Sequence, residues 1–186
     1  MKKILFLGTL LILLVACGSG NPKYSQENSN LLHNMIENQS LEIISNRALP
    51  LMTSALQQLG NAGLFVNGST AGSIDISTHS NYLRMKKDSV MASLPFYGER
   101  QFGGGYNSAS GIEFEGIADD LKIKKGKESS YEISFNMSDK NSSTDNYRVY
   151  IKLFPNLTSV ISINSSSRSN IQYRGNVHAI DSDNND

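Results

Sequence analysis

Two pairs of carboxylates in this 186-residue chain stand close enough together to take part in acid–base chemistry. They are Glu113 with Glu115, and Asp119 with Asp120. A glycoside hydrolase needs two opposed carboxyl groups, one of them with a raised pKa. Glu113 and Glu115 are two residues apart, so in a strand both side chains point to the same face. We interpret them as a solvated strand face. A glycan-directed hydrolase that uses Glu113 with Asp119 or Asp120 is an alternative function.

Other residues of the kinds that bind metals or perform nucleophilic catalysis are not spaced for that chemistry. The histidines, His33, His79 and His178, lie far apart, and none has a second ligand at metal spacing. A nucleophile elbow G-x-S-x-G is absent from the sequence. The glycines at 103–105 begin a dinucleotide pattern, but Ser108 stands where its third glycine belongs. The sequence therefore predicts no catalytic residue, no metal site and no cofactor.

Cys17 is the only cysteine of the chain, and it follows an N-terminal segment typical of exported proteins. Lys2 and Lys3 precede an apolar run, Ile4–Val15, that is too short for a comfortable membrane span. The ending Leu-Val-Ala-Cys is similar to the lipobox of bacterial lipoproteins. We predict that residues 1–16 are a signal peptide and that Cys17 carries a diacylglycerol and an acylated N-terminus. More than one acyl chain gives a stable membrane anchor.

The residues after Cys17 indicate a flexible tether, and they indicate on which side of the cell envelope the protein lies. Residues 17–28 are rich in Gly, Ser, Asn and Pro, which is typical of a flexible linker. Gly18 stands where an Asp would favour retention in the inner membrane, and no acidic run of the kind that signals surface export follows. We therefore expect an outer-membrane anchor with the protein facing the periplasm. Residues 29–180 are predicted to form one domain, and residues 181–186 a disordered tail.

The balance of charge excludes one class of partner. The chain has 17 basic and 17 acidic residues, which leaves no basic excess for a phosphate backbone. We expect no nucleic-acid partner. The predicted domain is long enough for one hydrophobic core, and we expect a monomer.

The first third of the predicted domain has helical periodicity. Apolar residues in Ser29–Asn38 fall on one face of a short helix. Pro50–Leu59 begins with Pro and precedes a Gly, which are helix start and stop signals. Its Met52, Leu56 and Leu59 are expected to face the core. The segment Leu41–Ser45 between them either continues the first helix or begins a strand.

From Gly72 onward, apolar and polar residues alternate with a period of two, which indicates strands. A bulge or bend is expected near His79–Asn81, where the parity changes, and a hairpin turn at Lys86–Asp88. The strand count is about eight or nine. Short loops between successive strands predict antiparallel pairing as a meander. The fold class is therefore mainly β, a β-rich α+β fold: a curved sheet that closes as a barrel or sandwich, with helical segments at its start.

The stretch Ser93–Gly116 interrupts this alternation with aromatic residues, a Pro and three successive glycines. Pro95 is expected to end a strand. We interpret Phe96 and Tyr97 as an aromatic plug over one end of the sheet, with Gly103–Gly105 turning the chain back. The alternative is a surface that binds a partner, made of Tyr97, Arg100, Phe102 and Tyr106.

Ser89 is a possible site of modification. Asp88-Ser89-Val90 looks like the acceptor motif for O-glycosylation in Bacteroidetes, and it lies at the predicted hairpin. A turn is where a modifying enzyme could reach the hydroxyl. Asp-Ser is also an ordinary turn pair.

Four segments together resemble a family of uncharacterised Bacteroidetes lipoproteins, domain of unknown function 4251. They are residues 82–90 (YLRMKKDSV), 94–100 (LPFYGER), 111–114 (GIEF) and 167–175 (SRSNIQYRG). The resemblance implies a secreted lipoprotein domain. It implies no activity and no catalytic residues.

These observations favour a non-enzymatic lipoprotein of the cell envelope that binds a protein or glycan partner. The first alternative is a lipocalin-like carrier of a small apolar ligand. Such a carrier predicts an apolar cavity inside the barrel, lined by Ile133, Phe135, Val149 and Ile151. The hydrolase is the second alternative.

Overall fold

The computed structural model of the chain describes residues 24–65, 68–101, 111–141 and 145–180. Two helices and ten strands follow one another along these ranges. Their bounds are α2 Gln26–Glu37, β1 Ser40–Pro50, α3 Ser54–Asn61, β2 Ile74–Asp75, β3 Tyr82–Lys86, β4 Ser89–Pro95, β5 Gly111–Ile117, β6 Asp119–Lys125, β7 Tyr131–Ser138, β8 Asn146–Leu153, β9 Thr158–Ser165 and β10 Ile171–His178. Within the described ranges, neither helix has the length and apolar character needed to cross a membrane.

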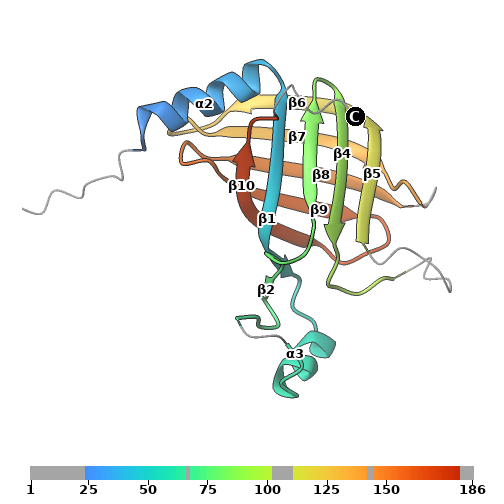
Figure 1. Cartoon of the computed structure of the whole chain (residues 1–186). Helices are drawn as coiled ribbons and strands as arrows, with labels where there is room; N and C mark the ends of the chain where they lie inside the picture. The colour runs from blue at the N-terminus through green and yellow to red at the C-terminus, as the bar shows by residue number, and fades with distance from the viewer. Residues whose placement is uncertain (1–23, 66–67, 102–110, 142–144, 181–186) are drawn as a thin grey trace, which may run out of the picture.

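The strands form one antiparallel sheet that curls until it is nearly closed into a barrel (Figure 1). Its order is β5-β4-β3-β1-β10-β9-β8-β7-β6, and the short β2 pairs with β1. In Figure 1 the strands β1, β3, β4 and β5 stand upright in front, β6 to β9 cross behind them, and β10 curves upward beside β1. The prediction of a β-rich antiparallel fold is confirmed. It consists of two meanders, β3–β5 and β6–β10, and the first strand joins them.

The inside of the barrel is a single hydrophobic core. Its largest fully buried side chains include Phe114, Tyr147 and Tyr173. The side chains expected to line a carrier cavity belong to the same core and are at most 2% exposed: Ile133, Phe135, Val149 and Ile151. Burying one such apolar side chain contributes about 1.5–3 kcal/mol. These four side chains are therefore part of what stabilises the barrel.

A bulge in β1 lets this one strand pair with three others. The register against β10 shifts between Ser45 and Arg47, while β3 pairs before this point and β2 pairs after it. At the gap, the Asn81 side chain takes the place of a strand: its Oδ1 accepts from the Ser45 N–H and its Nδ2 donates to the Ser45 carbonyl, both at 2.9 Å. The bulge or bend expected near His79–Asn81 is a bend at His79. The bulge lies in β1, and Asn81 satisfies its backbone.

The helix α2 lies close to its predicted place. Leu32, Met35 and Ile36 are buried against the barrel. After a turn the chain enters β1, so Leu41–Ser45 belongs to a strand and does not continue the helix.

The second helix, α3, begins later than predicted and is not part of the core. Pro50 ends β1, and Thr53 caps the helix by accepting from the Leu56 N–H at 3.3 Å. Leu56 is buried, but Met52 and Leu59 are exposed, contrary to expectation. The reason is that the segment carrying α3 projects beyond the end of the barrel (Figure 1), so only one side of a short helix meets other residues.

The contact between β10 and β1 requires a glycine at position 175. A Cβ atom there would lie 2.0 Å from the Ile44 carbonyl oxygen and 2.6 Å from the Ser45 Cα. We predict that Gly175→Ala lowers the free energy of unfolding by about 3 kcal/mol or more, because the two backbones must move apart. Urea denaturation measures the loss. The control is Asn176→Ala on the same strand, whose side chain is exposed. Equal stability of the two variants would contradict the prediction.

Candidate functional site

The aromatic segment after β4 packs against the barrel. Pro95 ends β4, as predicted. Phe96 and Tyr97 are partly buried and contact the hydrophobic core, which agrees with an aromatic plug. Gly103–Gly105 lie outside the described residues, so their predicted role as a turn is untested.

Two members of the predicted binding surface lie in the described part of the chain. Burial raises the pKa of the Tyr97 hydroxyl above its usual value. Arg100 is mostly buried, and its Nη2 lies 3.7 Å from Asp145 Oδ2. Phe102 and Tyr106 lie outside the described residues. Tyr97 and Arg100 are thus engaged with the body of the protein.

Arg168 is the centre of a buried polar cluster next to this segment, and it is only 4% exposed. Its Nη2 lies 3.3 Å from Asp145 Oδ2 and 3.5 Å from Asp139 Oδ2. Its Nη1 donates to the Gly111 carbonyl at 2.5 Å, and its guanidinium carbon lies 5.4 Å from the centre of the Phe96 ring. One side chain between β9 and β10 therefore holds both ends of the β7–β8 loop and the start of β5.

The charges of this cluster are matched and hydrogen-bonded. Arg168 and Arg100 face Asp139 and Asp145. The Tyr147 hydroxyl donates to Asp139, and the Ser167 hydroxyl donates to Asp145. Burial and the bond to Asp139 raise the pKa of Tyr147. A buried ion pair offsets its desolvation only with such additional bonds. Because each charged group has a partner within the protein, we assign the cluster a structural role.

The predicted acid pairs lie on the outer surface. Glu113 accepts from Asn141 Nδ2 at 2.9 Å. Glu115 forms an ion pair with Lys140 at 2.6 Å, and this partner raises the pKa of the Lys140 ammonium.

At the start of β6, Asp119 and Asp120 are both exposed, and Asp120 accepts from Asn136 at 3.3 Å. With the partners of Glu113 and Glu115, three of the four predicted acids are engaged with neighbouring side chains.

Of the two predicted modification sites, Ser89 lies among the described residues and Cys17 does not. Ser89 is the first residue of β4 and is half-buried, opposite Lys86 in the β3–β4 hairpin. The hairpin is confirmed, and glycosylation of Ser89 stays a prediction. Cys17 lies outside the described residues.

The outer surface of β6–β9 carries two successive rows of side chains around Tyr150, which we call the Tyr150 face. The strand register places Ser134, Tyr150 and Ser162 in one row, with Lys122 at its β6 end. The next row consists of Lys124, Glu132, Lys152 and Val160. Every one of these side chains points away from the core, because the residues between them along each strand point inward.

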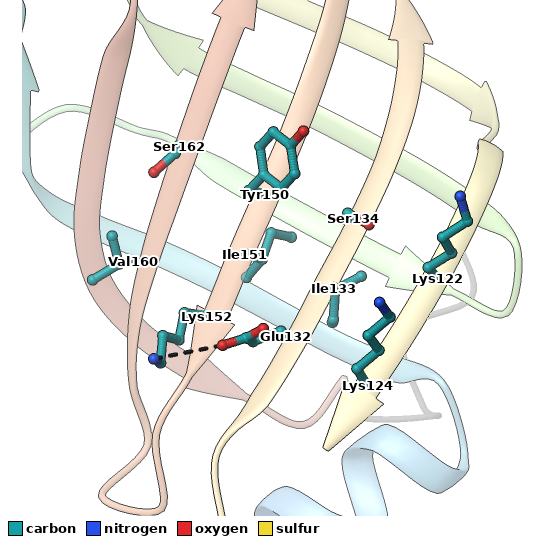
Figure 2. Close-up of a pocket in the computed structure, with 10 residues that line it drawn as sticks. All are labelled: Lys122, Lys124, Glu132, Ile133, Ser134, Tyr150, Ile151, Lys152, Val160 and Ser162. Atoms are coloured by element: carbon teal, nitrogen blue, oxygen red, sulfur yellow. Dashed lines mark ion pairs between the residues drawn. The ribbon is translucent and has the colours of Figure 1, made fainter. Parts of the chain in front are cut away.

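The Tyr150 face is hollowed, with a volume of about 440 Å³ (Figure 2). Tyr150 is 45% exposed between two small serine side chains. Among the described residues, the side chains of Ser134, Tyr150 and Ser162 have no hydrogen-bond partner. Lys152 Nζ lies 3.6 Å from Glu132 Oε1, the ion pair drawn in Figure 2. The face thus offers solvent an aromatic ring, unpaired hydroxyls and ammonium groups.

Sequence reasoning missed both Tyr150 and Arg168. A signal for Tyr150 was present: the alternation in Tyr147–Leu153 puts it on the wet face, where a large aromatic is less common than inside. Arg168 gave no such signal, because an arginine in a serine-rich turn is usually exposed.

Comparison with known proteins identifies a family and a fold. The profile of a domain family of unknown function, DUF4251, matches residues 23–177. A crystal structure of a DUF4251 family protein from Bacteroides eggerthii has a similar fold, with a TM-score of 0.53 and 12% sequence identity. The similarity covers 82% of this chain and 88% of that one. No curated protein matches the chain.

The Arg168 cluster predicts a large effect of removing its central cation. Arg168→Met should lower the free energy of unfolding by about 3–5 kcal/mol, because Asp139 and Asp145 stay buried with less compensation. Arg174→Met is the matched control, since that arginine lies on the exposed side of β10. Urea denaturation of both variants is the measurement. A loss for Arg168→Met no greater than that of the control would contradict the assigned role.

Proposed function

Since this chain belongs to the DUF4251 family, whose function is unknown, we propose a function from its own residues: a lipid-anchored binding module of the cell envelope. In this proposal the lipid on Cys17 holds the domain at the outer membrane, on the periplasmic side. The Tyr150 face binds the partner. The domain performs no catalysis.

The sequence before the domain supports the anchor. The short apolar run, the lipobox-like ending and the single cysteine all point to lipidation at Cys17. The first helix, α2, begins at Gln26, nine residues after Cys17, and in this proposal the residues between them serve as a linker. A module on such a linker stays at the membrane surface and keeps its sheet accessible.

The single observation that carries the binding role is the Tyr150 face. Tyrosine is enriched in recognition surfaces because it offers a large apolar ring and a hydroxyl at a low cost in side-chain entropy. Here the ring stands between two serines whose hydroxyls have no partner among the described residues. The fold does not need this arrangement, because the core lies on the other side of the same strands.

The two alternatives have less support. A barrel-like fold suits a carrier, but the side chains expected to line its cavity pack into the core. A hydrolase needs an acid with a raised pKa opposite a second one. Glu113 and Glu115 instead bind side chains of the β7–β8 loop.

The anchor predicts that one residue decides lipid attachment. The full chain, expressed in bacteria fed an alkyne analogue of palmitate, should take up the label, and Cys17→Ala should lose it, because no other thiol is available. In-gel fluorescence after coupling to a dye measures the label. Ser19→Ala is the control and should keep it. A labelled Cys17→Ala variant would refute the anchor at this position.

The binding face predicts a loss of affinity on removing the ring. We expect the full chain, purified in detergent, to bind at least one ligand on an array of envelope saccharides and peptides. Tyr150→Ala should weaken that binding by about tenfold, the equivalent of one good contact. Tyr82→Ala, a strand tyrosine in the other layer, is the matched control. If the array ligands bind both variants with the same affinity as the unchanged protein, the binding site lies elsewhere on the domain.

A further inference from the structure

We infer that the ligand of the Tyr150 face is an acidic polysaccharide. The inference rests on the proposed function, because it names the ligand class of the same face. Three features of the described residues lead to it: the charge of the face, the chemistry around the ring, and the length of the hollowed surface.

The charge of the face differs from that of the whole protein. The chain has 17 basic and 17 acidic residues, yet three lysines and one glutamate line the hollow: Lys122, Lys124, Lys152 and Glu132. Glu132 is paired with Lys152, whereas Lys122 and Lys124 form no ion pair within the described part of the chain. Two unpaired ammonium groups at one side of a hollow complement carboxylate or sulfate groups on a ligand.

The centre of the face suits a sugar ring. Tyr150 can lie against the apolar side of a pyranose, and the hydroxyls of Ser134 and Ser162 flank it in the same row. Each serine can both donate and accept, as sugar hydroxyls require. Serine is small, so room remains on both sides of the ring. Lys122 ends this row, which places an ammonium beside the sugar site (Figure 2).

The hollowed surface continues along the strands, as a polymer would need. A second hollow of about 400 Å³ lies on the same face and is lined by Asn136, Arg148 and Asn164, among others. The register puts these three in the row next to Tyr150, about 7 Å farther along the strands. Amides and a guanidinium are again sugar- and anion-binding groups. Asp119 stands opposite Asn136 at the β6 end of this row and also lines the hollow, so the excess of cations is greatest near Lys122 and Lys124.

A membrane surface is the competing polyanion, and the face is less suited to it. Interfacial binding uses apolar residues that insert among the lipids, next to basic ones. Here the exposed aromatic stands in a hollow between serines, and the residues beyond it are amides. The hydroxyls of Ser134, Tyr150 and Ser162, which have no partner among the described residues, are matched by a polyhydroxylated ligand better than by acyl chains.

The test compares acidic polymers with their neutral counterparts on the full chain in detergent. Polygalacturonate and its methyl ester share one backbone, as do dextran sulfate and dextran. By isothermal titration calorimetry we expect at least one acidic polymer to bind about tenfold more tightly than its neutral partner. Raising the salt should weaken only the acidic one. Lys122→Gln combined with Lys124→Gln should remove most of this difference. Tyr150→Ala should weaken both members of the pair.

The control is Lys86→Gln combined with Lys87→Gln, the same change of charge at the β3–β4 hairpin, which should leave binding unchanged. Equal affinity for acidic and neutral polymers, with loss in Tyr150→Ala, would overturn the inference and leave the proposed function standing. Binding only to phosphatidylglycerol vesicles, lost in the Lys122/Lys124 variant, would replace the polysaccharide with a membrane. If no acidic polymer binds, the inference fails, and the array experiment decides the proposed function separately.

Discussion

The buried guanidinium of Arg168 is the contact on which the arrangement of the loops depends. It joins three parts of the chain that are far apart in sequence: the β7–β8 loop through Asp139 and Asp145, the start of β5 through Gly111, and the aromatic plug through Phe96. The gap in the barrel lies between β5 and β6, where the order of paired strands ends. Arg168 therefore holds the loops at one end of a barrel in which β5 and β6, the two edge strands, are not paired with each other.

The strands β7, β8 and β9 serve two purposes at once. Their inward residues complete the core, and their outward residues form the Tyr150 face. Alternation separates the two sets, so the outward residues can change without altering the packing inside.

The sequence predicted correctly those features that depend on interactions between residues close together in the chain. The hairpin at Lys86–Asp88 and the alternation of β7 and β8 were correct because turn chemistry and burial act within a few residues. The bulge in β1 was not predicted, and the expected core contacts of Met52 and Leu59 were wrong. Both depend on which distant segment lies opposite: Asn81 at Ser45, and solvent at the two apolar side chains. Arg168 binds Asp145, 23 positions away, and lies against Phe96, 72 positions away, so no short window of sequence contains the cluster.

The position of β1 has a consequence for the order of folding. β1 is the first strand of the chain, yet its longest partner is β10, the last, with Glu42 opposite His178. Such pairing has a high contact order, which slows folding and delays it until the chain is complete. A nascent chain can pair β3–β5 and β6–β9 early, but it cannot join the two groups before β10 is available. The sheet therefore stays divided into two groups of strands until β10 has been made and can pair with both β1 and β9.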